Sequence, residues 1–299
     1  MTMLAVRAAG SLRGAAPLDG PARDSWAQDD LTSRPSAAGR ASAAQTGPLV
    51  PAGQAPLVLL HAFPLSSQMW GPMAVDLPEL PILAFDLPGA GFSPTLEPAT
   101  IEAAGRAVID SLTELGVDRA VVAGVSMGGY VAMSILRDAP ERLAGVFLMH
   151  TKAEADGPEA RRGRLETARQ VLAAGSTEIL RPMASKMVSP TSRATSPGLV
   201  ETIEGWIDQA TPGGVAWAEQ AMAGRPDAMA VLRASGTPAS VVAGADDPFA
   251  TVAQAEAMVD ALGPTASLTV LTGVAHLGPL EGPNVTARLL REFYRRVLA

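Results

Sequence analysis

In residues 119–137 an apolar run, a glycine-rich turn and a helical pattern follow one another: Arg119-Ala-Val-Val-Ala-Gly-Val-Ser-Met-Gly-Gly-Tyr-Val-Ala-Met-Ser-Ile-Leu-Arg137. The pattern predicts a short buried strand over residues 120–123 and a helix over residues 127–138. The turn has the form G-x-S-x-G, which lifts a serine hydroxyl above a sheet and leaves no room for side chains on either flank. Ser126 is therefore a candidate nucleophile, and an ordinary glycine-serine turn is the alternative interpretation.

Composition limits the classes of protein to which the chain can belong. With 299 residues, 47% hydrophobic and 18% charged, it can bury a full core as one large domain or two small ones. The net charge of -7 and the lack of a Lys/Arg cluster argue against a nucleic acid or an anionic membrane surface as partner. Cys is absent, which excludes disulfides and thiolate chemistry, and only three histidines could serve as a base: His61, His150 and His276.

No targeting or membrane segment is expected. No apolar run approaches the roughly twenty residues that a membrane-spanning helix needs. Residues 1–14 contain arginines but lack the apolar region of a signal peptide. We therefore expect a cytoplasmic protein, although composition leaves the compartment open.

Residues 1–54 are rich in Ala, Gly, Pro, Ser and Arg and show no apolar period, which predicts a disordered or weakly ordered segment. The alternative is that part of residues 41–50 adds an antiparallel edge strand. From Pro56 onward apolar runs predict strands at 57–60, 82–85, 120–123, 145–149, 240–243 and 267–271. Helical patterns separate them at 66–77, 99–115, 127–138, 251–262 and 283–298.

Short apolar strands that alternate with helices predict an α/β fold with a mostly parallel, doubly wound sheet, formed by residues 55–150 and 236–299. In such sheets ligands bind beyond the carboxyl ends of the strands, so the loops after each strand are the places to search. Most of these loops are polar or glycine-rich, which favours one site along this edge of the sheet.

Residues 151–235 interrupt the alternation with helical patterns at 158–174, 177–188 and 199–210. The stretch is too long and too helical for a connection, so we expect a helical lid that covers the strand ends and encloses a pocket. Met183, Met187 and Trp206 are candidates for contact with a substrate. The alternative is that these side chains only fill the interior of the lid.

Three residue types at separate strand ends complete a candidate catalytic set. A serine hydroxyl is a poor nucleophile until a base removes its proton, and the base works best when an acid fixes its tautomer. Ser126, one of the aspartates at 246 and 247, and His276 occur in the order Ser, Asp, His. For His276 a structural role is the alternative.

Five motifs resemble those of the α/β-hydrolase superfamily, especially its small esterases, lactonases and cofactor-free haloperoxidase-like members. The resemblance extends over about residues 56–298, and the motifs that carry it are His61-Ala-Phe-Pro64, Asp86-Leu-Pro-Gly-Ala-Gly91, Gly124-Val-Ser-Met-Gly128, Gly244-Ala-Asp-Asp247, and Gly273-Val-Ala-His276 with Leu280-Glu-Gly-Pro283. It implies that Asp247 is the acid, with Asp246 as the alternative.

The resemblance also implies an oxyanion hole formed by the backbone N–H groups of Phe63 and Met127, and it implies no cofactor and no metal. We expect His61 and His150 to contact the substrate, with a structural role as the alternative for His150. Ala62 replaces the glycine that usually follows the histidine of the first motif. The two strands that usually precede that motif are not visible, so we expect a shorter sheet at that edge.

The sequence thus predicts a serine hydrolase that cleaves a small to medium, largely apolar ester or lactone through an acyl-enzyme. Its partner would be a small-molecule acyl substrate, and the oligomeric state is left open. The rival hypothesis is a non-catalytic binding protein that uses the same fold and the covered pocket as a receptor or scaffold.

Overall fold

Seven strands form one sheet in the part of the chain that the computed structural model describes, which is residues 3–13, 50 and 53–299. The order across the sheet is β1-β3-β2-β4-β5-β6-β7, and all neighbours are parallel except β1 and β3. The strands are β1 (Val6–Ala8), β2 (Leu57–Leu60), β3 (Ile82–Phe85), β4 (Ala120–Val125), β5 (Leu143–Met149), β6 (Ala239–Gly244) and β7 (Ala266–Leu271). The six predicted strands and the mostly parallel α/β fold are confirmed.

The strands from β2 to β6 are buried along their whole length. Helices cover both faces of a parallel sheet, so its inner strands are largely apolar, mostly Val, Leu, Ile and Ala, without polar alternation. β7 is the last strand of the sheet and is only partly buried. Its sequence, Ala-Ser-Leu-Thr-Val-Leu, accordingly mixes apolar and hydroxyl side chains.

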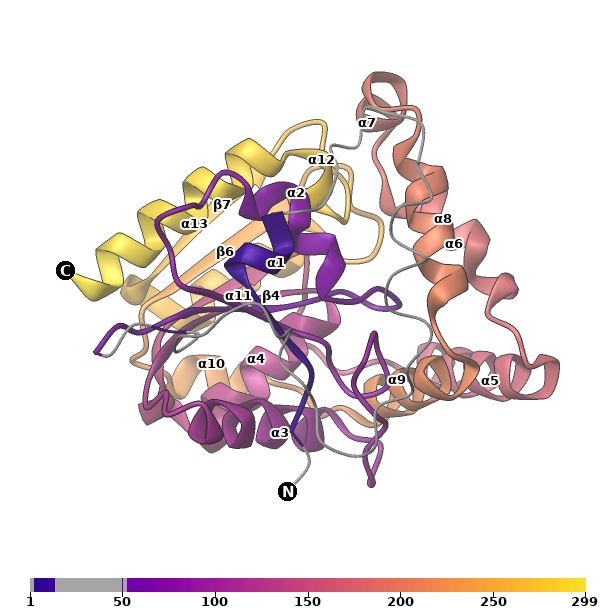
Figure 1. The fold of residues 1–299 in the computed structure, drawn as a ribbon, viewed down its shortest axis with the longest axis horizontal. Helices are drawn as coiled ribbons and strands as arrows, with labels where there is room; N and C mark the ends of the chain where they lie inside the picture. The colour runs from indigo at the N-terminus through magenta and orange to yellow at the C-terminus, as the bar shows by residue number, and fades with distance from the viewer. Residues whose placement is uncertain (1–2, 14–49, 51–52) are drawn as a thin grey trace.

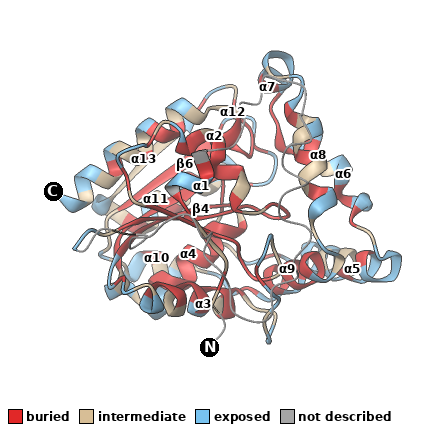
Figure 2. Cartoon of the chain, in the orientation of Figure 1, coloured by how far each residue is buried: buried red, intermediate tan, exposed pale blue. Residues whose placement is uncertain are grey.

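Two groups of helices lie on the two faces of the sheet (Figure 1). One group is α3 (Ile101–Glu114), α4 (Met127–Asp138), α10 (Met229–Ala234) and α11 (Val252–Leu262). The other is α1 (Ala9–Arg13), α2 (Gly71–Ala74), α12 (Gly278–Glu281) and α13 (Pro283–Leu298). The helix expected over 66–77 is two short pieces, the 3₁₀-helix η1 (Ser67–Trp70) and α2. Buried residues line the sides of the helices that face the sheet (Figure 2).

Local sequence signals set the ends of the longer helices. Thr100 Oγ1 accepts the N–H of Ala103 at 3.1 Å and caps α3. Thr251 and Gln254 form a reciprocal capping box at the start of α11. Such caps satisfy backbone N–H groups that have no partner inside the helix, so they stabilise these two helix starts.

A helical insertion separates β5 from β6 and projects to one side of the sheet in Figure 1. Its main helices are α5 (Pro158–Ala174), α6 (Arg181–Met187), α7 (Pro190–Thr195), α8 (Leu199–Gln209) and α9 (Pro212–Gly224). α5 packs on α9, and α6 packs on α8. The outer side of α5 is exposed (Figure 2). The three expected helical patterns are therefore confirmed as structure, whereas α7 and α9 were not predicted.

The interpretation of residues 1–54 as disordered or weakly ordered is wrong for residues 3–13. β1 pairs with β3 at the edge of the sheet, and Leu4 and Leu12 are buried, with 1% and 2% of their surfaces exposed. A three-residue strand is too short to show an alternating pattern, so no periodicity marked it. The alternative strand within residues 41–50 falls on residues 41–49, which lie outside the described residues, and on Val50, which lies in a bend.

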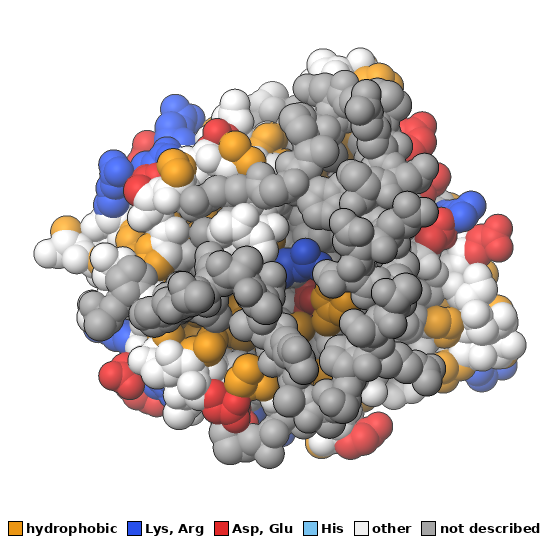
Figure 3. Space-filling model, in the orientation of Figure 1, with side chains coloured by type: hydrophobic (Ala, Val, Ile, Leu, Met, Phe, Trp, Pro, Cys, Tyr) orange, Lys and Arg blue, Asp and Glu red, His pale blue; other side chains and the backbone are white. Residues whose placement is uncertain are grey.

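On the face shown in Figure 3, basic and acidic side chains of the described residues are interspersed around the rim. In the described part of the chain, no helix has an apolar stretch long enough to cross a membrane.

Candidate functional site

The sheet register brings the loops after five strands to one edge. Leu60 at the end of β2 pairs with Gly124 of β4, and Met149 at the end of β5 pairs with Val125 of β4. β5 in turn pairs with β6, and β6 with β7. The loops that contain Phe63, Ser126, His150, Asp247 and His276 therefore leave the sheet at the same edge, as expected for a ligand site in such a fold.

Ser126 stands in a strained turn between β4 and α4, with φ 53° and ψ -112°. A side chain at Gly124 would meet the backbone of Gly128, and one at Gly128 would meet the carbonyl of Leu60. A hydrogen bond joins the turn to the end of β5, because the Ser126 N–H donates to the Met149 carbonyl at 3.0 Å. Backbone strain of this kind costs on the order of 1–3 kcal/mol and persists only where the surroundings enforce it.

Thr151 supports the same turn from the next loop. Its hydroxyl donates to the Ser126 carbonyl at 2.8 Å, and a side chain at Gly129 would collide with it. Ser126 itself is half-buried, so its side chain is accessible at the edge of the sheet.

Asp247 and His276 form a close pair. His276 Nδ1 lies 2.9 and 2.8 Å from the two carboxylate oxygens of Asp247, and Oδ1 also accepts the N–H groups of Phe249 and Ala250. Burial opposes ionisation of Asp247, but the two neighbouring imidazoles, His150 and His276, outweigh it and hold its pKa below the usual range. The carboxylate is therefore ionised at neutral pH and fixes the orientation of the His276 ring.

The alternative acid, Asp246, is exposed, and its backbone N–H donates to the Val274 carbonyl. The structure thus places Asp247, and not Asp246, against His276.

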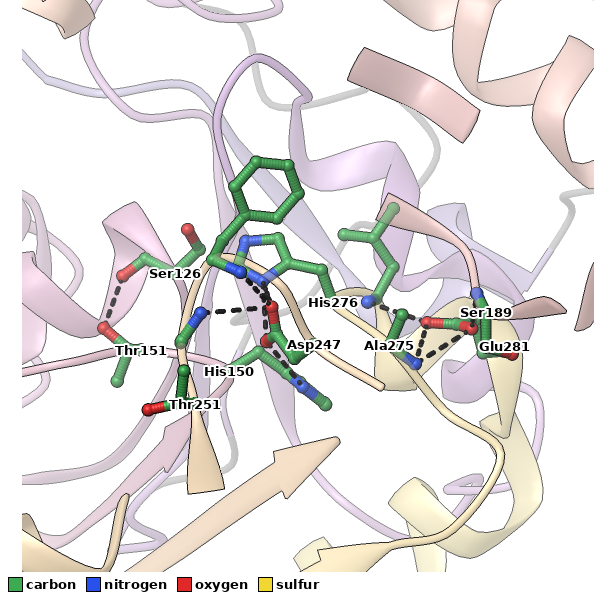
Figure 4. A network of polar contacts seen from close by, with 12 residues as sticks. Ser126, His150, Thr151, Ser189, Asp247, Thr251, Ala275, His276 and Glu281 are labelled. Atoms are coloured by element: carbon green, nitrogen blue, oxygen red, sulfur yellow. Dashed lines mark hydrogen bonds and ion pairs between the residues drawn. The ribbon is translucent and has the colours of Figure 1, made fainter. Parts of the chain in front are cut away.

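Ser126 and His276 face each other across the site without a direct bond. In Figure 4 the second ring nitrogen of His276, Nε2, points away from Asp247, toward the side on which Ser126 lies. Among the described residues no hydrogen bond joins Ser126 Oγ to His276. Contacts between a nucleophile and its base are often long in the absence of substrate, so this geometry is compatible with proton transfer.

Two backbone N–H groups beside Ser126 have no hydrogen-bond acceptor among the described residues. They belong to Phe63, in the loop after β2, and Met127, the first residue of α4. Both residues line a cavity with an empty volume of about 480 Å³. The start of a helix favours negative charge, because its first N–H groups lack partners within the helix. Ala62 has no positive φ angle, so the replacement of glycine there introduces no strain of that kind.

His61 lies at the wall of this cavity but is fully buried. Its Nε2 accepts the N–H of Leu87 at 2.9 Å, so Nδ1 carries the proton and donates to the Ala62 carbonyl at 3.0 Å. Burial lowers the pKa of His61, although the Ala62 carbonyl and the charge of Asp86 act in the opposite direction. Both ring nitrogens are occupied by the protein, so the ring braces two loops, and the substrate contact expected of His61 stays a prediction.

The insertion contributes Trp206 of α8 to the cavity wall. Gln209 at the end of α8 accepts a hydrogen bond from Gln68 of η1 at 3.3 Å, which joins the insertion to the sheet domain beside the cavity. Met183 and Met187 are not among the described residues that line this cavity. Met187 is buried, and its carbonyl accepts the N–H of His276 at 3.0 Å.

His150 also lies away from the described cavity wall. Its side chain is completely buried, and Nδ1 is 3.6 Å from Oδ2 of Asp247. The expectation that His150 lines the substrate pocket is therefore not met, because the ring lies behind the carboxylate and not in front of it (Figure 4).

Two side chains near His276 were missed by sequence reasoning. Glu281 accepts the N–H groups of Ala275, Leu277 and Ser189, and so holds the loop on both sides of His276 (Figure 4). The ring of Phe249 lies 4.9 Å from that of His276, measured between centroids. Glu281 appeared in the sequence only as part of a family motif, and no pattern marked Phe249.

The arrangement supplies a hydroxyl, an imidazole held by a carboxylate, and two N–H donors without an acceptor in the described part of the chain. These are the parts needed for attack on a carbonyl carbon and for stabilisation of the resulting oxyanion. No group of three or more His, Cys, Asp or Glu side chains in the described ranges is arranged to hold a metal ion.

Comparison with known proteins gives consistent matches. The family model of the alpha/beta hydrolase fold matches residues 55–283. The solved structure of a thermophilic esterase from Thermogutta terrifontis, with malate bound, superposes with a TM-score of 0.78 at 34% identity, over 82% of this chain and 90% of that one. The chain is 29% identical to 3-oxoadipate enol-lactonase 2 of Acinetobacter baylyi over 68% of its own length and 74% of that protein. It is 36% identical to lipase LipV of Mycobacterium tuberculosis, but over only 37% of this chain and 42% of the lipase.

Proposed function

The chain belongs to the α/β-hydrolase fold family, and from this premise we propose that it is a serine hydrolase that cleaves a carboxylic ester or a lactone. The observation that carries the proposal is the contact between Asp247 and His276, 2.8 Å, at the edge of the sheet to which the strained turn brings the half-buried Ser126. Similarity to proteins named as an esterase, an enol-lactonase and a lipase supports the same reaction class.

In the proposed mechanism Ser126 Oγ attacks the acyl carbon while Nε2 of His276 takes its proton. Asp247 stays ionised and stabilises the imidazolium that forms. The proton then passes to the leaving alcohol, and an acyl group remains on Ser126. Water, deprotonated by the same imidazole, attacks this acyl-enzyme and releases the acid.

The N–H groups of Phe63 and Met127 would bind the oxyanion in both steps. Because they are main-chain groups fixed by β2 and α4, they need little reorganisation as the charge develops. Loss of one such donor in other enzymes costs on the order of 3 kcal/mol of transition-state stabilisation.

The described cavity wall favours an uncharged, largely apolar acyl substrate of small to medium size. It combines Phe63, Trp206, Val215 and Ala218 with the amides of Gln68 and Gln209. We propose that residues 151–235 act as a lid, because α8 supplies part of this wall. No cofactor enters the proposed mechanism, and cytoplasmic location stays a prediction.

Replacement of Ser126 tests the assignment. Ser126→Ala should reduce kcat for a p-nitrophenyl ester by about 10⁴-fold or more and abolish labelling by a fluorophosphonate, with the melting temperature retained. Ser134→Ala is the matched control, because Ser134 lies on the same helix α4, is buried and has a hydroxyl with no partner among the described residues. A Ser126→Ala protein that is still labelled would contradict Ser126 as the nucleophile, whereas a native protein inactive on esters of every chain length would favour the non-catalytic binding protein.

A further inference from the structure

His150 combines two features that destabilise a folded protein. It has φ 47°, a region that side chains other than glycine and asparagine rarely adopt. Its side chain is fully buried, and neither ring nitrogen has a hydrogen-bond partner among the described residues. Each feature costs free energy, and such outliers concentrate at functional sites.

The surroundings of the ring determine which nitrogen can act. Nε2 lies directly against Gly278, where even a Cβ atom would overlap with it. Nδ1 lies 3.6 Å from Oδ2 of Asp247. We therefore assign a proton to Nδ1, because a carboxylate oxygen faces that nitrogen, whereas Nε2 has no hydrogen-bond partner among the described residues.

Asp247 is consequently held from several directions. Phe249 and Ala250 donate their N–H groups to Oδ1, and His276 approaches both oxygens. His150 lies on the remaining side, so the carboxylate sits between two imidazole rings (Figure 4).

We propose that His150 is a positioning residue that acts through Asp247, keeping its carboxylate directed at His276 and sharing its negative charge. This inference rests on the proposed function. At 3.6 Å the Nδ1–H of His150 attracts the carboxylate electrostatically without a hydrogen bond, so it opposes rotation of the carboxylate and offsets part of the charge that stabilises the imidazolium of His276. Loss of this donor should therefore lower kcat through poorer orientation and make His276 more basic.

Other titratable groups on the surrounding elements are Tyr130 on α4, whose pKa burial raises, and Glu281 on α12, which binds backbone N–H groups of the His276 loop. Tyr130 is neutral between pH 5 and 8, and both side chains are unchanged in the variants below, so they contribute equally to every pH profile compared.

Three substitutions separate the roles of the two ring nitrogens. His150→Asn places an amide N–H near the position of Nδ1 and suits the left-handed backbone. His150→Gln moves the amide toward the position of Nε2, which lies against Gly278 and has no hydrogen-bond partner among the described residues. His150→Leu removes the donor and keeps apolar volume.

We expect His150→Leu to lower kcat about tenfold with KM within about twofold, a loss typical of residues coupled through direct contact. The acidic limb of kcat/KM should move upward by about half a pH unit, because that limb reports the base of the free enzyme. His150→Asn should retain kcat within about threefold, and its acidic limb of kcat/KM should stay at the pH of the native protein. His150→Gln should resemble His150→Leu.

Unchanged kcat and an unchanged acidic limb in folded His150→Leu, together with an inactive Ser126→Ala, would overturn the inference and leave the proposed function standing. Activity retained by Ser126→Ala would overturn both the proposed function and this inference. If His150→Leu does not fold, the comparison of His150→Gln with His150→Asn decides. The same kcat and the same acidic limb of kcat/KM in both variants would contradict the positioning role. A lower kcat in His150→Gln alone would support it. A melting temperature that falls with no kinetic change would mean that the residue is only structural.

Discussion

Single side chains fix the loops that carry the candidate oxyanion donors. His61 joins the loop after β2 to the loop after β3, because one ring nitrogen binds the Ala62 carbonyl and the other accepts the N–H of Leu87. A protonated ring has no acceptor nitrogen, so it could not keep the Leu87 contact. The position of Phe63, two residues further on, therefore depends on a neutral His61.

This dependence predicts a loss of stability in acid. Burial lowers the pKa of His61 in the folded state, so below about pH 6.5 the unfolded chain binds a proton that the folded chain does not. Stability should fall as the pH decreases through this range, by up to about 1.4 kcal/mol per pH unit from this residue. Urea unfolding at pH 7.5, 6.5 and 5.5 measures the effect.

His61→Gln is the matched variant, since the amide oxygen can accept the Leu87 N–H and does not titrate in this range. The pH dependence of its unfolding free energy should be smaller than that of the native protein, while the other two histidines contribute to both. Equal slopes in the two proteins would contradict the role assigned to His61.

Among the secondary-structure elements, the segment that joins α6 to α7 ties the insertion to the His276 loop. Ser189 Oγ donates to the Gly273 carbonyl at 2.6 Å, and its N–H donates to Glu281 at 2.7 Å. The N–H of His276 donates to the Met187 carbonyl at 3.0 Å. A displacement of the insertion would therefore be transmitted directly to the candidate base.

Glu281→Ala should lower both stability and kcat, because the N–H groups of Ser189, Ala275 and Leu277 lose their acceptor. Each buried donor left unpaired costs about 1–3 kcal/mol, and water will replace part of the lost bonding, so we expect a loss of about 3 kcal/mol in the free energy of unfolding. A disordered His276 loop should reduce kcat about tenfold. Urea unfolding and steady-state kinetics on the same ester provide the measurements.

Glu292→Ala is the matched control, because it removes a glutamate carboxylate from the exposed side of α13. It should change the free energy of unfolding by no more than about 0.5 kcal/mol. Native kcat in Glu281→Ala, at a temperature where the variant is folded, would show that the loop does not need this carboxylate.

For the molecule as a whole, residues 3–13 complete the sheet at the edge where the sequence suggested that it ends. The N–H of Asp86 donates to the Ala5 carbonyl, and the N–H of Leu4 donates to Ser111 Oγ on α3 at 3.0 Å. Pairing with β1 also covers backbone groups of β3 that would otherwise form an open edge. These contacts link the first residues of the chain to both the sheet and a helix of the core.

Leu4→Ala should therefore lower the free energy of unfolding by about 3 kcal/mol, as expected for a buried leucine. Val270→Ala is the control, because Val270 lies on the opposite edge strand with 42% of its surface exposed. Its free energy of unfolding should fall much less than that of Leu4→Ala. Activity per folded molecule should be unchanged in both. A Leu4→Ala protein as stable as the native one would mean that β1 contributes little to the fold.

The site was only partly predictable from sequence, and the reason differs from residue to residue. The Ser126 turn was predicted well, because the steric requirement for Gly124 and Gly128 arises within a few residues. The choice between Asp246 and Asp247 could only be narrowed by a family motif. The surroundings of His61 and His150 could not be predicted, because their burial and contacts depend on loops from other strands.

By itself the sequence determined the strand and helix positions from β2 onward, the helical character of the insertion and the position of the Ser126 turn. These follow from local periodicity and glycine sterics, which act over a few neighbouring residues. The tertiary structure alone decided that Asp247 meets His276, that Glu281 reaches Ser189, and that β1 closes the sheet. Such contacts join residues 29 and 92 positions apart, so they depend on strand order and register, which no short stretch of sequence encodes.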